Sequence, residues 1–180
     1  AKGHYVMVTN RGLHTTSNGN SQQNAITPDW PDTVTREIPA EAIYLYDVDQ
    51  EDWFCPTHHP LNDPRAAHTA EFSVDGTALF RMSRGTISTE LTVFVPPHET
   101  VGVYLLTVKN RGAKTRRLRV APYFQISLVG QAESRPRPLL EKRDDALGAL
   151  YFENPTNDFR YGPAFASMSL PIDRMETRRG

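Results

Sequence analysis

Alternation of apolar and polar residues with a period of two is the feature that most constrains how this chain can fold. The segment GTISTELTVFVPP (85–97) shows it clearly. The mainly apolar row on one side of this extended segment contains Ile87, Thr89, Leu91, Val93 and Val95. The opposite row carries hydroxyls and one carboxylate, on Thr86, Ser88, Glu90 and Thr92. Such a period is typical of a strand with one buried face, and we interpret the polar row as structural rather than sugar-binding.

The same alternation, rich in β-branched and aromatic residues, runs through most of the chain. Further strands are predicted at 4–9, 42–47, 68–74, 77–83, 101–110, 115–130, 147–154 and 163–170. Hairpin turns are predicted at 74–77 and 109–115, where Gly76 and Gly112 can supply a positive φ. Many short strands separated by turn signals predict an all-β chain with little helix, folded as a large antiparallel β-sandwich in a single domain over residues 1–180.

Three segments depart from simple alternation. Pro122 cannot donate to a sheet ladder and therefore indicates an edge position or a bulge in its strand. Residues 137–150 have apolar side chains only near their two ends, which predicts a loop with about one turn of helix. Residues 15–40 are polar and rich in amides and proline, and a loop of that length is usually functional or disordered.

Composition excludes several classes of function. The net charge is −1 over 180 residues, without a long run of one sign, so neither a nucleic acid nor an anionic membrane is an expected partner. No apolar stretch is long enough to cross a bilayer. The single cysteine, Cys55, excludes an internal disulfide and fits a reducing compartment.

Four motifs, in their order along the chain, resemble the N-terminal β-sandwich domain of glycoside hydrolase family 94. They are NAITPDWPDTV (24–34), EAIYLYD (41–47), TELTVFVPP (89–97) and LLTVKNRGAKTRRLRV (105–120). This family contains cellobiose and chitobiose phosphorylases, and the resemblance is strongest to the phosphorylase-like part of cyclic β-1,2-glucan synthase.

The resemblance implies a supersandwich with galactose-mutarotase-like topology, followed in the parent enzyme by an (α/α)-barrel that holds the general acid and the phosphate site. We therefore expect a truncated piece of a multidomain enzyme, inactive by itself and without a cofactor. The implied parent is a glycosyltransferase or phosphorylase acting on β-glucans. Its implied partners are an oligosaccharide or glucan, its own barrel and a second copy in a homodimer. The implied location is the cytoplasm, either free or as the cytoplasmic part of an inner-membrane protein.

The resemblance also points to substrate-binding residues. Arg81 matches a strand arginine that reaches the sugar cleft in this family, and a guanidinium can bond vicinal hydroxyls in a bidentate manner. A salt bridge on the sheet surface is the alternative for Arg81. Gln23 and Asn24 offer amide donors and acceptors that suit sugar hydroxyls, and Trp30 could stack on a sugar face. A flexible polar loop is the alternative for these three.

Other chemistry-bearing groups are assigned structural roles. The soft ligands Cys55, His58 and His59 match no zinc spacing, so no metal site is predicted. The acidic run 47–52 is interpreted as a solvated hairpin loop, and Trp53, Tyr44 and Tyr46 as core or hairpin packing. A general acid and base of the mutarotase type could be chosen from Glu71, Glu90, His68 and His98. Likeness of fold is not evidence of function, however, and no catalytic residue is predicted.

Two other classes of function remain open at this point. The chain could be a free-standing carbohydrate-binding module, or a structural domain that binds no ligand. The sequence that follows Gly180 in the gene would discriminate between them, because a helical-repeat barrel there supports the enzyme-domain hypothesis.

Overall fold

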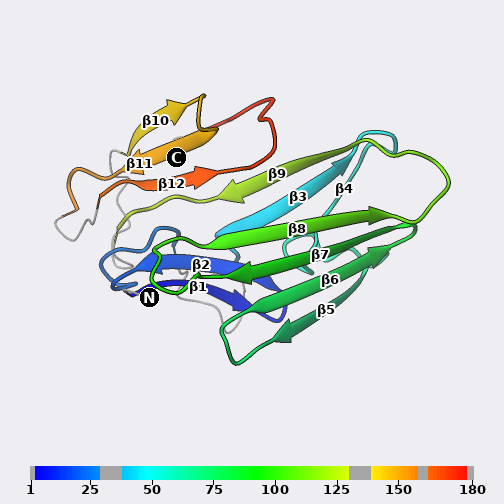
Figure 1. The fold of residues 1–180 in the computed structure, drawn as a ribbon, viewed down its shortest axis with the longest axis horizontal. Coiled ribbons are helices and arrows are strands. Elements are labelled where there is room, and N and C mark those ends of the chain that lie inside the picture. Colours follow the sequence, from blue (N-terminus) through cyan, green and yellow to red (C-terminus); the bar gives the residue numbers. More distant parts are fainter. Residues whose placement is uncertain (1–2, 29–37, 130–138, 158–161, 178–180) are drawn as a thin grey trace.

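The protein forms two packed layers of antiparallel strands with a further three-stranded sheet at one side (Figure 1). The computed structural model describes residues 3–28, 38–129, 139–157 and 162–177. No helix occurs within these ranges, and accordingly none in them is long and apolar enough to cross a membrane. The predicted all-β antiparallel sandwich is therefore confirmed.

Twelve strands follow one another along the described chain. In the first half they are β1 (His4–Thr9), β2 (Gly12–Asn18), β3 (Glu41–Asp47), β4 (Asp52–Phe54), β5 (Ala67–Phe72) and β6 (Ala78–Arg84). In the second half they are β7 (Ile87–Phe94), β8 (Val103–Asn110), β9 (Leu118–Phe124), β10 (Leu140–Asp144), β11 (Ala149–Glu153) and β12 (Ala164–Ser167).

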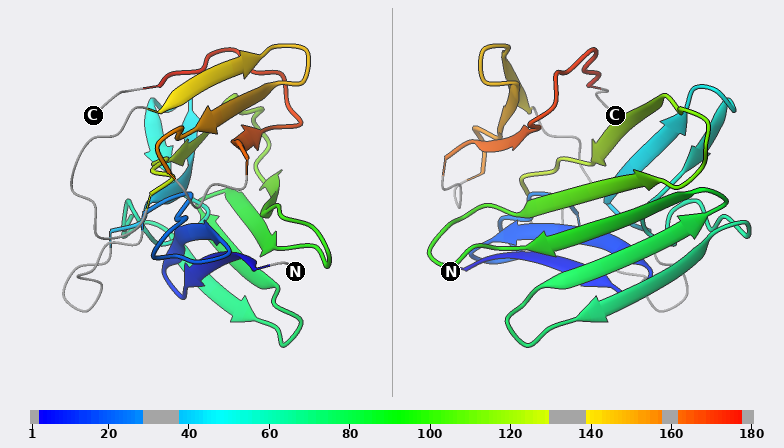
Figure 2. Two further views of the ribbon diagram at one scale, coloured as in Figure 1. Left: turned by 90° about the vertical axis from the view of Figure 1, so that its left-hand side faces the viewer. Right: turned by 45° about the vertical axis from the view of Figure 1, so that its right-hand side comes forward.

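The strands form four sheets. One layer is the meander β5-β6-β7-β8, and the facing layer contains the sheet β4-β3-β9 and the hairpin β1-β2 (Figure 2). The sheet β10-β11-β12 lies to one side of both. Side chains from both layers make up the core, which includes Leu13 of β2, Ile43 and Leu45 of β3, and Phe80 and Leu91 of the meander.

Strand β7 shows how the alternation produces this core. Its residues alternate strictly between buried and partly exposed from Ile87 to Phe94, as the sequence predicts. The odd-numbered residues face the opposite layer, and the even-numbered residues form part of the outer face of the meander. Burying one apolar row is the main stabilising contribution, and a shift of register by one residue would reverse both rows.

Two predictions about loops need correction: the predicted loop 15–40 begins inside β2, and β10 lies where a helical turn was expected. The acidic run 47–52 forms the predicted hairpin loop, because it connects the antiparallel strands β3 and β4. The middle of β2 is polar and nevertheless buried, and partners satisfy its two threonines: the Thr15 hydroxyl donates to the Thr27 carbonyl (2.6 Å), and the Thr16 amide donates to the Thr27 hydroxyl (2.7 Å). Polarity predicts exposure only when such partners are absent.

The predictions for individual turn and edge residues have mixed outcomes. Gly76 has a φ of 86°, as expected for its turn, whereas Gly112 is not among the residues with positive φ. The side chain of Asn110 holds that second loop instead, accepting a hydrogen bond from the Gly112 amide (3.0 Å) and donating one to the Lys114 carbonyl (2.8 Å). Pro122 lies in β9, which has a sheet partner only on its β3 side among the described strands, so the edge prediction is confirmed; the pairing there contains no bulge.

Candidate functional site

Arg81 lies in the middle of β6 on the outer face of the meander. Its neighbours Phe80 and Met82 point inward and are 2% exposed, whereas the Arg81 side chain is 43% exposed. The guanidinium pairs with two carboxylates from the flanking strands. Arg81 Nε donates to Glu90 of β7 (3.1 Å) and Nη1 donates to Glu71 of β5. The surface salt bridge foreseen as the alternative is therefore present, and a sugar contact at Arg81 remains a prediction.

Hydroxyl groups surround this charged triplet. The register places Thr69 of β5, Arg81, Glu90 and Thr107 of β8 in one row across the four strands. All side chains in such a row point to the same side of the sheet. The outer face of the meander therefore combines donors and acceptors, and its central charges are already neutralised by one another.

Gln23 and Asn24 lie in a compact turn after β2, on the other layer. The Asn24 side chain is buried and donates to the carbonyl of Asn18 (3.1 Å). Gln23 accepts a bond from the Asn20 side chain (3.1 Å) through its own side chain, and one from Asn157 (3.1 Å) through its carbonyl. These contacts connect the turn to the end of β2 and to Asn157, and a sugar contact at Gln23 and Asn24 remains a prediction.

The predicted binding residues do not converge on one site. Arg81 faces outward from the meander, whereas Gln23 and Asn24 follow a strand of the opposite layer, with the core between them. Trp30 lies outside the described residues.

A buried carboxylate that sequence reasoning missed lies between the layers. Glu41 of β3 is 1% exposed; the Thr27 hydroxyl donates to its Oε1 (2.7 Å), and the Tyr104 hydroxyl donates to its Oε2 (2.6 Å). Burial, and then the Glu41 charge, raise the pKa of Tyr104 well above its usual range. No Lys or Arg among the described residues pairs with Glu41, so hydroxyl donors alone hold it. The motif EAIYLYD gave no signal of this, because the partners come from distant segments.

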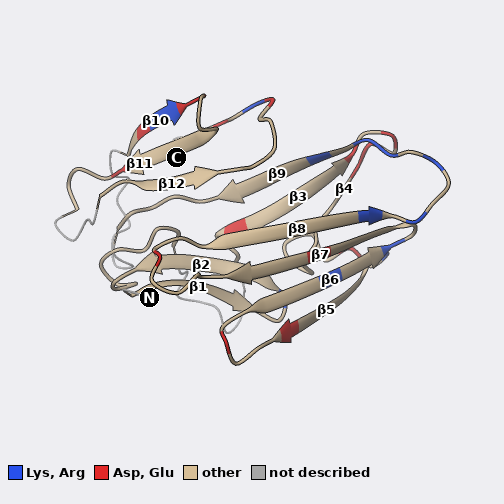
Figure 3. Cartoon of the chain, in the orientation of Figure 1, with Lys and Arg blue, Asp and Glu red and all other residues tan. Residues whose placement is uncertain are grey.

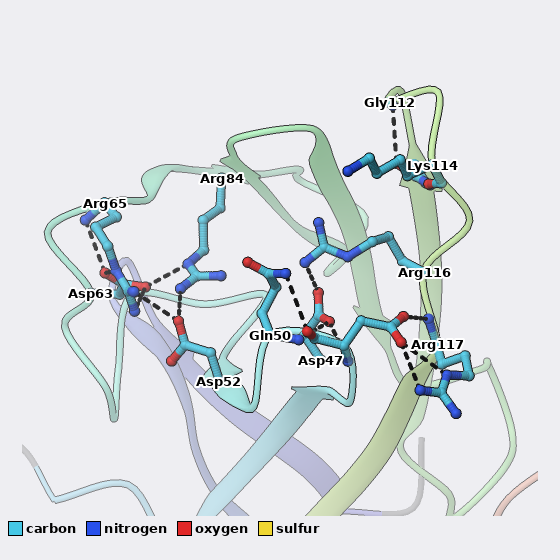
Figure 4. Close-up of polar contacts among 12 residues, drawn as sticks. Asp47, Gln50, Asp52, Asp63, Arg65, Arg84, Gly112, Lys114, Arg116 and Arg117 are labelled. Atoms are coloured by element: carbon cyan, nitrogen blue, oxygen red, sulfur yellow. Dashed lines mark hydrogen bonds and ion pairs between the residues drawn. The ribbon is translucent and has the colours of Figure 1, made fainter.

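Charged residues gather at one end of the sandwich, around the β3–β4 and β8–β9 connections (Figure 3). Arg84 of β6 pairs with Asp63 (2.8 Å) and with Asp52 of β4, and Arg65 pairs with the same two carboxylates (Figure 4). Hydrogen bonds from these guanidiniums, Arg65 first, lower the pKa of both Asp52 and Asp63.

The other half of this ionic end connects β3 to the β8–β9 loop. Asp47 is fully buried, pairs with Arg116, and accepts backbone bonds from Asp49 (3.0 Å) and Gln50 (3.1 Å). Asp49 is held by the backbone and side chain of Arg117 (2.8 Å). The prediction of a solvated acidic loop is therefore wrong for Asp47. Its arginine partner lies 69 residues further along the chain, and no local pattern indicates that pairing.

Cys55, His58 and His68 lie near the end of β4 and contact one another. Burial raises the pKa of the Cys55 thiol to about 12. The rings of His58 and His68 meet edge to face at 5.6 Å. No group of three or more potential ligands with metal-binding geometry occurs in the ranges that the structure describes.

A cluster of aromatic side chains covers the outer face of the sheet β4-β3-β9. Trp53 of β4 stacks at a tilt on its cross-strand partner Tyr46 (4.7 Å between ring centroids) and meets Tyr44 edge-on (6.1 Å). Tyr123 of β9 lies opposite Ala42 on the same face. Trp53 and Tyr123 are each 47% exposed. Trp53 therefore packs across the β3–β4 hairpin, as predicted, and it does so on the outer face, since the inward residues of β3 are Ile43 and Leu45.

Comparison with protein families gives a match along the whole chain. The family model described as the supersandwich domain of glycosyl hydrolase 94 matches residues 1–180. No curated protein matches the chain. An all-β sandwich of packed antiparallel sheets is the architecture that this family description names. The chain belongs to the glycosyl hydrolase 94 supersandwich family.

Proposed function

We propose that this chain is the non-catalytic supersandwich part of an enzyme that acts on β-linked glucans, of the cyclic β-1,2-glucan synthase type. It supports the catalytic barrel of its parent chain and lines one side of the sugar cleft. The family match over all 180 residues is the observation that carries this proposal. A homodimer of the parent and a cytoplasmic location belong to the same proposal.

The state of the carboxylates supports a non-catalytic role. A general acid in a glycosidase-type reaction needs a raised pKa and access to the leaving group. The arginines of the ionic end lower the pKa of Asp52 and Asp63 instead. Glu71 and Glu90 form ion pairs with Arg81, and Glu41 is buried between the layers. These carboxylates contribute to folding rather than to proton transfer.

Turnover by the parent and by this domain alone tests the proposal. We expect the parent to act on β-glucans, and the isolated domain, checked for a cooperative melting transition, to show no phosphorolysis, hydrolysis or glycosyl transfer. Turnover by the pure domain, lost on substitution of one of its own carboxylates, would contradict the non-catalytic role. A parent without any activity on β-glucans would contradict the substrate class.

Arg81 tests whether the outer face of the meander lines the cleft. In the parent, Arg81→Ala should reduce kcat/KM for a β-glucan by roughly ten- to a hundredfold, because a charge-assisted bond to a hydroxyl is lost. Arg81→Lys should recover little, since an ammonium lacks the planar fork. Arg117→Ala is the control, because Arg117 also binds an aspartate in an exposed pair, at the ionic end. If the two alanine variants have equal kcat/KM values, Arg81 makes salt bridges on the sheet surface and no contact with the sugar.

A further inference from the structure

The outer face of the sheet β4-β3-β9 is an exposed surface built mainly of aromatic side chains. It concentrates Trp53, Tyr44, Tyr46 and Tyr123 on three adjacent strands, and its exposed groups include no aliphatic side chain larger than alanine at the paired positions. The register puts Arg119 beside Tyr46 on the same face. Other exposed apolar residues, such as Phe72 and Leu105 of the meander, lie on a different sheet.

We propose that this aromatic face is a second glucan-binding site, separate from the face that carries Arg81, on which pyranose rings stack. The proposal rests on the proposed function for its ligand class. It concerns the outer face of β4-β3-β9, which carries none of Arg81, Gln23 and Asn24.

The geometry of the rings supports stacking. Tyr46 and Tyr44 are two residues apart on β3, so their rings are offset by about 6.6 Å along the strand. Trp53 packs against both, and Tyr123 extends the row by a similar step at the position of Ala42. This row is long enough for more than one sugar ring. Because Trp53 and Tyr46 already contact each other, Trp53 needs little additional ordering when a ligand binds.

Electrostatic complementarity selects a sugar over an aliphatic protein surface. The face of an aromatic ring is negative, whereas the axial C–H groups of a pyranose are weakly positive. At the edges of the rings, the hydroxyls of Tyr44, Tyr46 and Tyr123 form no hydrogen bonds within the described residues. Arg119 has no ion-pair partner there either, so its guanidinium can donate to sugar hydroxyls. An aliphatic partner would leave all of these polar groups without bonds.

The probes are linear β-1,2-glucopentaose and cellopentaose, added to the full-length parent protein. Titration calorimetry measures the dissociation constant for the wild type, Trp53→Ala, Tyr123→Ala and the control Tyr5→Ala. Tyr5 is exposed on β1, outside the aromatic face. We expect Trp53→Ala and Tyr123→Ala each to weaken binding of at least one pentaose by about tenfold. Tyr5→Ala should bind like the wild type.

A second measurement needs no substitution. N-bromosuccinimide oxidises exposed tryptophan, and peptide mass mapping separates Trp53 from Trp30. We expect Trp53 to be oxidised rapidly in the free parent and to be protected by the pentaose. Slow oxidation of Trp53 without sugar would show that another part of the parent covers this face, and the proposal would be overturned. It would also be overturned if the pentaose gave no protection, or if Trp53→Ala, with an unchanged melting temperature, bound like the wild type.

These outcomes are distinct from failure of the proposed function. Turnover of the shortest accepted substrate is measured in the same variants, and we expect it to be unchanged, because the aromatic face does not touch the reacting bond. If the parent shows no β-glucan turnover while the pentaose still protects Trp53, the proposed enzyme class fails and the binding site stands. If turnover is normal and the pentaose does not protect Trp53, the proposed enzyme class stands and the second binding site fails.

Discussion

The two outer faces of the sandwich follow the same period-two rule and have opposite chemistry. On the meander, Arg81 is satisfied by Glu71 and Glu90, and hydroxyls surround them. On β4-β3-β9, Trp53 and the tyrosines contact one another, and their polar tips remain without hydrogen bonds among the described residues. The difference shows that alternation determines which side chains face out, whereas cross-strand neighbours determine which of their polar groups are already bonded within the sheet.

The largest expected effect separates the inner and outer rows of one strand. Phe80→Ala removes a fully buried ring from the core and should lower the free energy of unfolding by about 3–5 kcal/mol. Arg81→Ala, at the adjacent residue, should leave the melting temperature close to that of the wild type, because exposed ion pairs contribute little. Thermal melts of both variants check this, and a large loss for Arg81→Ala would mean that the outer triplet stabilises the fold.

The next effect concerns the connection between the two layers. Arg84 of β6 binds Asp52 of β4 and Asp63 across the sandwich. Arg84→Ala should lower the free energy of unfolding by about 2–3 kcal/mol. This is less than the loss expected on removing a partner from a fully buried ion pair, because Arg65 still binds Asp63 and Asp52 is partly exposed. Urea unfolding measures the change. Arg117→Ala is the matched control, because its side chain is 73% exposed, and an equal loss in the two variants would contradict this ranking.

The same ion pairs predict a dependence on pH. The arginines lower the folded-state pKa of Asp52 and Asp63 below the unfolded value of about 4. Stability from these pairs is therefore complete above about pH 4 and is lost as the pH falls through the folded-state pKa values. Melting temperatures should decrease below that pH, and the difference in melting temperature between wild type and Arg84→Ala should become smaller. If that difference in melting temperature stayed constant down to pH 2, a contribution of these ion pairs to the pH dependence would be excluded.

A smaller effect is expected at the carboxylate between the layers. Tyr104→Phe removes one of the two hydroxyl donors to Glu41 and should cost about 1–2 kcal/mol. Tyr5→Phe, at an exposed tyrosine, is the control and should have almost no effect. Chemical denaturation of both variants measures the difference. The absence of any loss in Tyr104→Phe would indicate that water replaces the missing donor.

The smallest expected effect has the opposite sign. Thr89 of β7 is buried in the inner row, and its hydroxyl has no hydrogen-bond partner in the described part of the chain. Thr89→Val replaces that hydroxyl with a methyl group of similar size and should stabilise the protein by about 1 kcal/mol. Thr92→Val, in the outer row of the same strand, should change stability by less than about 0.5 kcal/mol. A destabilised Thr89→Val variant would indicate a partner for that hydroxyl.

Much of the fold could be predicted because alternation is a local signal. The strands at 4–9, 42–47 and 86–95 were expected almost at their observed bounds. Strands β2, β4 and β10 were missed because their residues are polar or few, and only pairing with other segments makes them strands. Strand β4, for example, has only three residues and pairs with β3 across a turn that carries acidic groups.

The candidate sites divide in the same way. The sequence by itself determined that Arg81 faces outward, because its neighbours Phe80 and Met82 belong to the apolar row. Only the tertiary structure decided that two glutamates occupy its guanidinium, that Glu41 is buried with Tyr104, and that Trp53 joins Tyr46 on an open face. The physical reason is the range of each interaction. Strand alternation acts between residues two apart, whereas these contacts join segments that only the packing of the sheets brings together.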